Sequence, residues 1–151
     1  MSASYLYRTT ARWTTRRNGI VESESPAPPI EFSAPPEFQG EAGRWTPEHF
    51  LLAAVSACFI TTFRAIAELS KFYPETLEVS VEGTVERAEE GYRFTHIVLQ
   101  PILTVGTEAE RERAGRLLEK AERSCLVSRS LKSDVRLEAT VRVATAAPAP
   151  A

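Results

Sequence analysis

Two cysteines are the residues of this sequence with the most distinctive chemistry. Cys58 stands inside the apolar run AAVSACFITTF, and Cys125 lies far along the chain in RSCLVSRS. A free cysteine often only fills a hydrophobic core, where burial raises its pKa and makes it inert. A thiolate, in contrast, is a strong nucleophile that can be oxidised reversibly. A structural and a reactive role are therefore both open for each thiol.

Local sequence signals favour Cys125 as the more acidic thiol. Cys58 is expected about three turns inside a helix, beyond the field of the helix end. Cys125 follows Ser124 at an expected helix start, with Arg123 and Arg129 close in sequence. Positive charge and a helix N-terminus both stabilise a thiolate. These signals predict the lower pKa at Cys125.

Other catalytic or metal sites have little support in the sequence. The two histidines, His49 and His96, have neither each other nor a cysteine at the spacing of a zinc site. Neither has an aspartate and a serine arranged as a recognisable triad. Glycine-rich phosphate loops and a nucleophile elbow are also missing from the sequence. We therefore expect no metal and no bound cofactor.

Length and composition predict one globular domain. The chain has 151 residues, 43% hydrophobic and 25% charged, with a net charge of -2. This balance gives no general attraction to nucleic acid or to anionic membranes. No signal peptide is recognisable, and the apolar stretch 50–60 is expected to be too short to span a membrane. We predict a cytoplasmic protein with one domain over residues 1–143 and a disordered tail over 144–151.

The first half of the chain predicts a hairpin, a loop and a long helix. Strands are expected over 5–13 and 20–23, joined by a turn at Asn18-Gly19 after Arg17, because Asn-Gly favours hairpin turns. A proline-rich loop follows, with one short strand at 30–33. Thr46 is a predicted N-cap, and Pro47 suits the first helical position. The helix is expected to end near Lys71.

The second half predicts a sheet and two helices. Strands are expected over 77–87 and 92–105, which alternate in polarity, and over 135–143. Thr107 and Glu110 form a capping box that begins a helix ending near Arg123, and a short helix follows Ser124. Strands grouped as hairpins indicate an α+β fold with a largely antiparallel sheet.

The helix that begins at Pro47 is apolar around most of its girth. One small sheet covers only one side of such a helix, so a second helix is expected to cover the rest. This predicts an obligate homodimer. Glu48 and Cys58 are about 15 Å apart along a straight helix. If both serve one site, either Glu48 comes from the partner's helix or a long arginine joins them.

Two segments resemble the OsmC/Ohr family of osmotically inducible and organic hydroperoxide resistance proteins. The first is Thr46-Pro47-Glu48 followed by LLAAVSACF, which is similar to the family signature N-P-E-x-L-x-A-A…A-C-F. The second is CLVSRSL, which resembles C-P-x-S-x-A, with Leu126 in place of the proline. The loop SAPPEF, residues 33–38, looks like the OsmC-like branch of the family. The resemblance covers roughly residues 5–143.

The resemblance implies sheets that wrap two long central helices in an intertwined homodimer. It also implies a thiol-dependent peroxidase that reduces organic hydroperoxides to alcohols. Cys58 would then be the peroxidatic thiol and Cys125 the resolving thiol, with an external dithiol as electron donor. Apolar neighbours such as Phe59, Phe63 and Trp45 would favour an organic substrate. A redox sensor or a small-ligand-binding dimer on the same fold is the alternative.

The implied chemistry calls for an arginine beside Cys58, because a guanidinium stabilises both the thiolate and the departing alkoxide. Arg17 resembles the arginine that some family members carry near their first hairpin turn, and Glu48 would hold its guanidinium. Arg16 and Arg44 are the alternatives. In the other class of the family the arginine precedes the glutamate by ten residues, where this sequence has Phe38.

Overall fold

The structure is a computed structural model that describes residues 3–25 and 27–145. Most of the tail predicted to be disordered therefore lies outside the described residues. The chain divides between Leu51 and Leu52 into two compact units. Helix α1 (Pro47–Leu69) begins in the first unit and supplies one layer of the second.

The first unit is built on a three-stranded antiparallel sheet in the order β1-β2-β3. Its strands are β1 (Thr9–Thr15), β2 (Asn18–Ser23) and β3 (Ile30–Ser33), followed by the 3-10 turn η1 (Pro36–Phe38). The short strand at 30–33 is confirmed. The predicted hairpin forms, but its turn is at Arg16 and Arg17, with Arg16 at φ 51°, and Thr15 pairs with Asn18.

The turn prediction was wrong because Asn18 and Gly19 are buried inside β2. The Asn18 amide donates a hydrogen bond to Glu41 Oε2 at 2.6 Å. Gly19 faces Phe32, and a Cβ at this position would lie 2.5 Å from the Phe32 ring. The glycine therefore meets a packing need in the sheet rather than the need for a positive φ.

Helix α1 begins as the sequence predicts. The Thr46 hydroxyl accepts a hydrogen bond from the His49 amide at 3.1 Å, and Pro47 is the first helical residue. The helix ends at Leu69, and Lys71 has a φ of 54°, which terminates the helical path. The helix has 23 residues, and its most apolar 18-residue stretch has a mean hydropathy of 1.9, so by length and composition alone α1 could cross a membrane, a test that the core helix of a soluble protein also passes. The apolar stretch is longer than the expected 50–60, because Phe63 and Ile66 continue it beyond the polar Thr61 and Thr62.

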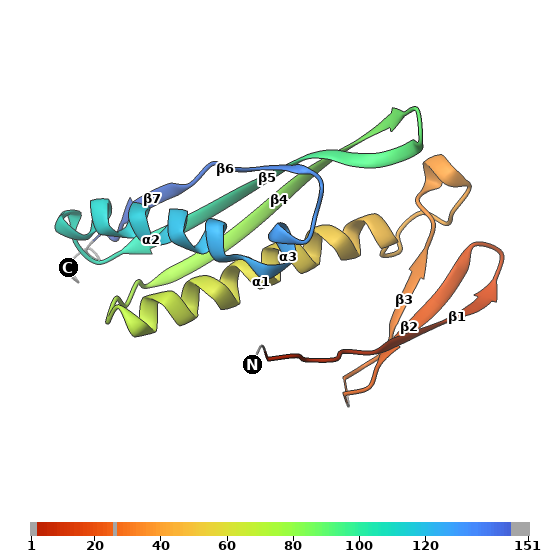
Figure 1. Cartoon of the computed structure of the whole chain (residues 1–151), viewed down its shortest axis with the longest axis horizontal. Helices are drawn as coiled ribbons and strands as arrows, with labels where there is room; N and C mark the ends of the chain where they lie inside the picture. Colours follow the sequence, from red (N-terminus) through yellow and green to blue (C-terminus); the bar gives the residue numbers. More distant parts are fainter. Residues whose placement is uncertain (1–2, 26, 146–151) are drawn as a thin grey trace, which may run out of the picture. The chain divides into compact units, whose positions relative to one another are not determined.

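The second unit pairs one sheet with helices (Figure 1). Its long antiparallel ribbon is β4 (Thr76–Ala88) and β5 (Gly91–Val105). Then come the 3-10 turn η2 (Glu108–Glu110), α2 (Arg111–Ser124) and α3 (Leu126–Arg129). Instead of one last strand, the chain forms β6 (Asp134–Leu137) and β7 (Thr140–Val143), both parallel to β5. The capping box at Thr107 and Glu110 is confirmed.

Strict alternation along the strands gives this sheet one apolar and one polar face. Leu99 of β5 lies between Val81 of β4 and Leu137 of β6, and all three belong to the core. Glu82, Val98 and Arg136 form the next row, which faces the other side. Helices α1 and α2 both pack on the apolar face, so the unit has two layers with its core between sheet and helices.

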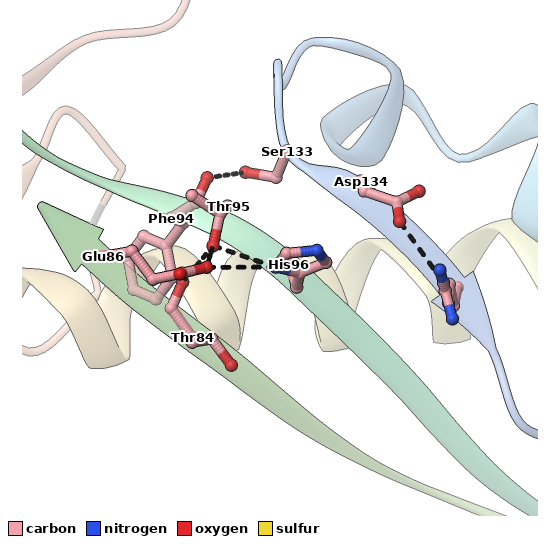
Figure 2. A network of polar contacts seen from close by, with 8 residues as sticks. Thr84, Glu86, Phe94, Thr95, His96, Ser133 and Asp134 are labelled. Atoms are coloured by element: carbon pink, nitrogen blue, oxygen red, sulfur yellow. Dashed lines mark hydrogen bonds and ion pairs between the residues drawn. The ribbon is translucent and has the colours of Figure 1, made fainter. Parts of the chain in front are cut away.

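A polar network braces an irregularity in the β4–β5 ribbon (Figure 2). The register shifts where His96 pairs with Thr84 but Phe94 pairs with Val85, so Thr95 is the extra residue of a bulge. The Thr95 hydroxyl donates a hydrogen bond to Glu86, whose carboxylate also lies 3.4 Å from His96 Nδ1. The Thr95 hydrogen bond, followed by the nearby His96, lowers the pKa of Glu86.

Helix α1 contributes only one stripe of its surface to the core of the chain. Val55, Phe59, Phe63 and Ala67 are fully buried. Small residues on another side of the same helix stay exposed, among them Ala54, Ala57, Thr61 and Ala65.

Candidate active site

The two cysteines come together within the second unit. Cys58 lies in the middle of α1 beside the buried stripe and is partly exposed. Cys125 lies between α2 and α3 and is completely buried. Its backbone, at φ −65° and ψ 113°, is extended and therefore interrupts the helical path. Both thiols are free in this structure, and their side chains are within hydrogen-bonding reach of each other.

The break at Cys125 also creates hydrogen-bond donors for Cys58. The Arg129 amide donates to the Cys125 carbonyl at 3.0 Å and closes the single turn of α3. The first amides of a helix have no carbonyl partner inside that helix. Here the amides of Leu126 and Val127 lie close enough to the Cys58 sulfur to stabilise its thiolate.

The pKa of the Cys58 thiol is lowered by these surroundings. Partial burial is the largest single influence and acts in the opposite direction, since it disfavours the thiolate. The Val127 amide and the Cys125 thiol are the main groups that stabilise the thiolate. The Thr62 hydroxyl, 3.8 Å from the sulfur, and the Leu126 amide add to them. Hydrogen bonds to the charged form prevail over burial.

The pKa of Cys125 is raised, so the prediction that Cys125 is the more acidic thiol was wrong. Complete burial is the main cause. The side chain and backbone of Ser128 act in the opposite direction, while the neighbouring Cys58 raises the pKa further. Sequence proximity to two arginines did not predict this outcome, because burial and the partner thiol depend on packing. Of the two thiols, Cys58 therefore has the lowered pKa and Cys125 the raised one.

The other predicted site residues belong to the first unit. Arg17 donates a long hydrogen bond of 3.5 Å to Gln39, and the Arg16 carbonyl accepts one from the Trp13 indole. Arg44 is paired with Glu31 at 2.6 Å and with a second glutamate at 3.4 Å. Glu48 lies in the first turn of α1, and its Oε2 is enclosed without a hydrogen-bond partner among the described residues. Of the four predicted site residues, Cys58 and Cys125 fall within the second unit, and Arg17 and Glu48 fall within the first.

Two of the three aromatic residues expected near the substrate lie in the hydrophobic core instead. Phe59 and Phe63 are completely buried and belong to the core, whereas Trp45 is half exposed and stacks on Phe50. Sequence reasoning also missed Thr62 and the two α3 amides as partners of Cys58. Thr62 could have been found, because it is one helical turn after Cys58. The two amides belong to the backbone, so no residue type in the sequence indicates their role.

The described part of the chain holds no cluster of side chains that could bind a metal ion. No three His, Cys, Asp or Glu side chains lie together there as a potential metal site.

Comparisons with known proteins agree with this architecture. The family model described as OsmC-like protein matches residues 40–140. The uncharacterised protein YmaD of Bacillus subtilis is 30% identical over 146 residues, which is 93% of this chain and 97% of that protein. Peroxiredoxin OsmC of Escherichia coli is 28% identical over 127 residues, covering 82% of this chain and 85% of that protein.

Solved structures show the same fold. An OsmC-like protein of Vibrio cholerae superposes with a TM-score of 0.79 at 18% identity, covering 90% of this chain and 99% of that chain. An organic hydroperoxide resistance protein OsmC of Legionella pneumophila gives 0.74 at 26% identity, covering 94% of this chain and 100% of that chain. The family model matches two thirds of the chain, and a relative with 30% identity aligns with 93% of it. The chain therefore belongs to the OsmC-like protein family.

Proposed function

We propose that this protein is a thiol-dependent peroxidase that reduces organic hydroperoxides to alcohols. The observation that carries the proposal is the contact of Cys58, a partly exposed thiol of lowered pKa, with the buried thiol of Cys125. Relatives named a peroxiredoxin and an organic hydroperoxide resistance protein support the choice of reaction and substrate.

The proposed reaction has two steps within the protein. The Cys58 thiolate attacks the distal oxygen of the hydroperoxide, the O–O bond breaks, and the alkoxide takes up a proton and leaves as the alcohol. Cys58 is now a sulfenic acid. The Cys125 sulfur then attacks the Cys58 sulfur, a disulfide forms, and the hydroxyl leaves as water with the Cys125 proton. The two side chains are within hydrogen-bonding reach of each other in the reduced protein, which supports this step.

An external dithiol completes the proposed cycle by reducing the disulfide with two electrons and two protons. No bound cofactor is needed for any of these steps. We further propose that the protein acts in the cytoplasm, where such reductants keep thiols reduced. Neither nucleic acid nor a membrane is a proposed partner.

Arg17 and Glu48 are the proposed residues that orient the peroxide and stabilise the thiolate. Two contacts favour Arg17 over Arg44. The Arg44 guanidinium is engaged by Glu31 at 2.6 Å, whereas Arg17 has only a long contact to a neutral amide. The enclosed Oε2 of Glu48 lacks a donor among the described residues, and a guanidinium would supply one. Arg16 is the alternative next to Arg17.

The homodimer is also part of the proposal. The apolar α1 has a row of exposed small residues, Ala54, Ala57, Thr61 and Ala65, that would let a second α1 approach closely. A helix apolar around its girth is expected to be buried. Sedimentation equilibrium tests this directly: a monomer at micromolar concentration would contradict the homodimer.

Peroxide consumption tests the enzymatic proposal. The assay uses cumene hydroperoxide and dithiothreitol with the wild type, Cys58→Ser, Cys125→Ser and Ser56→Ala. The Ser56 hydroxyl bonds to the Ala53 carbonyl and serves as the matched control on α1. We expect Cys58→Ser to be inactive, Cys125→Ser to stop after one turnover, and Ser56→Ala to keep wild-type activity. An active Cys58→Ser variant would contradict the proposal, and a disulfide without turnover would favour a redox sensor.

A further inference from the structure

A pocket of about 300 Å³ is lined by residues from the end of α2, helix α3 and the start of β6. Its walls come entirely from the second unit. They are formed by six residues: Glu122, Arg123, Ser128, Arg129, Ser133 and Val135. Ligand pockets in proteins have volumes of roughly 300–1,000 Å³, so this pocket suits a small molecule.

Two arginines give the pocket a positive charge. Arg123 and Arg129 form no ion pair with any of the described residues, whereas Arg116 on the same helix pairs with Glu112 at 3.1 Å. Glu122 contributes the single opposing charge, which leaves the lining with a net charge of +1. A guanidinium presents parallel N–H donors that match the oxygens of a carboxylate or phosphate.

A buried hydroxyl adds a third donor. Ser128 is only 7% exposed, and its Oγ is enclosed without a hydrogen-bond partner among the described residues. A buried hydroxyl without a partner is costly, so this group lacks an acceptor that a ligand would supply. The other serine of the pocket does not have this need, because the Ser133 hydroxyl donates to the Phe94 carbonyl at 2.8 Å (Figure 2).

We propose that this pocket binds a small molecule through its oxyanion, with Arg123 and Arg129 holding the charge and the Ser128 hydroxyl donating to an anionic oxygen. The shared chemistry is that of a carboxylate or a phosphate group. This binding does not depend on the proposed peroxidase function.

Ser128 links the pocket to the resolving cysteine. Ser128 lies beside Cys125 and favours its thiolate, although the Ser128 Oγ forms no hydrogen bond of ordinary geometry with any of the described residues. An anion that accepts a hydrogen bond from the Ser128 hydroxyl turns this group away from Cys125 and adds a negative charge nearby, so the pKa of Cys125 would rise further. Oxyanion binding would therefore change the pKa of Cys125 and leave the hydrogen-bond partners of Cys58 unchanged.

Titration of the reduced full-length protein with inorganic phosphate and, separately, with acetate tests the proposal. Binding is followed by calorimetry and by the amide shifts of the pocket residues in NMR spectra. We expect saturable binding of at least one anion, and the comparison shows whether phosphate or carboxylate is preferred. In Arg123→Gln and Arg129→Gln the affinity should fall roughly tenfold to a hundredfold, since each loses a charge-assisted hydrogen bond. Ser128→Ala should weaken binding several-fold.

Arg116→Gln is the matched control, because it removes one charge from the exposed side of the same helix without touching the pocket. It should bind as tightly as the wild type. An equal loss in Arg116→Gln, or no saturation with either anion, would overturn the proposal. If Arg123 and Arg129 only stabilise the carboxyl ends of their helices, their replacement would lower the melting temperature and leave the anion affinity unchanged. That result would also overturn the proposal. Two separate arginine variants keep the test valid if one fails to fold.

Discussion

The Cys125 thiol lies within hydrogen-bonding reach of the Cys58 sulfur, where the middle of α1 meets the break between α2 and α3. The contact lowers the pKa of Cys58 and raises that of Cys125. The two neighbouring thiols therefore shift each other's pKa in opposite directions, in addition to the effect of burial on Cys125.

The first prediction is that Cys58 ionises at lower pH than Cys125. Alkylation of the reduced protein by iodoacetamide, followed by peptide mass spectrometry, gives a rate for each thiol against pH. Since only the thiolate reacts, the midpoint for Cys58 should lie below the ordinary cysteine value of about 8.5, and that for Cys125 above it. The midpoint is compared rather than the rate, because burial slows Cys125 at every pH. A lower midpoint at Cys125 would reverse the assignment.

The second prediction concerns the backbone amide of Leu126. Leu126→Pro removes this donor to Cys58 and should raise the pKa of Cys58 by about half a unit to one unit. The fold should tolerate the change, because Leu126 is the first residue of α3 and Cys125 before it is already extended. Leu126→Ala is the control, since it keeps the amide and trims a side chain that is 69% exposed. Equal Cys58 midpoints in the two variants would exclude a role for this amide.

The third prediction concerns the hydroxyl of Thr62, whose Oγ1 lies 3.8 Å from the Cys58 sulfur. Thr62→Val keeps the shape of the side chain and should raise the Cys58 alkylation midpoint by up to about one unit. Thr61→Val is the control, because the Thr61 hydroxyl bonds to the Cys58 carbonyl and not to its sulfur. A shift in the control that matches the shift in Thr62→Val would indicate a general change in α1.

The fourth prediction compares two glycines of the second unit. A Cβ at Gly83 would lie 2.6 Å from the Phe94 ring and 2.8 Å from Leu52 Cδ2, so Gly83→Ala should lower the free energy of unfolding by about 1–3 kcal/mol. Nothing lies within 4 Å of a Cβ at Gly115 in α2. Gly115→Ala should instead raise stability by up to about 1 kcal/mol, because alanine favours a helix. Urea denaturation measures both, and a destabilised Gly115→Ala would contradict the open surroundings of Gly115.

Much of the architecture could be predicted because it depends on local signals. The alternation of residues 77–87, the cap at Thr46 and the capping box at Thr107 each act over a few residues. The two resembling segments also identified the family and both cysteines. The hairpin turn was misplaced because the strongest local turn signal, Asn18-Gly19, was outweighed by burial against Phe32. The last strand divided in two, and no local pattern indicated that both parts pair in parallel with β5.

The sequence by itself determined which residues have reactive chemistry, since only two thiols exist, and which segments form helices and strands. The tertiary structure alone decided which thiol is the acid. A pKa depends on solvent access and on donors within hydrogen-bonding distance, and both are set by packing. The Val127 amide that stabilises the Cys58 thiolate comes from a residue far along the chain, and the burial that raises the pKa of Cys125 comes from the folded core.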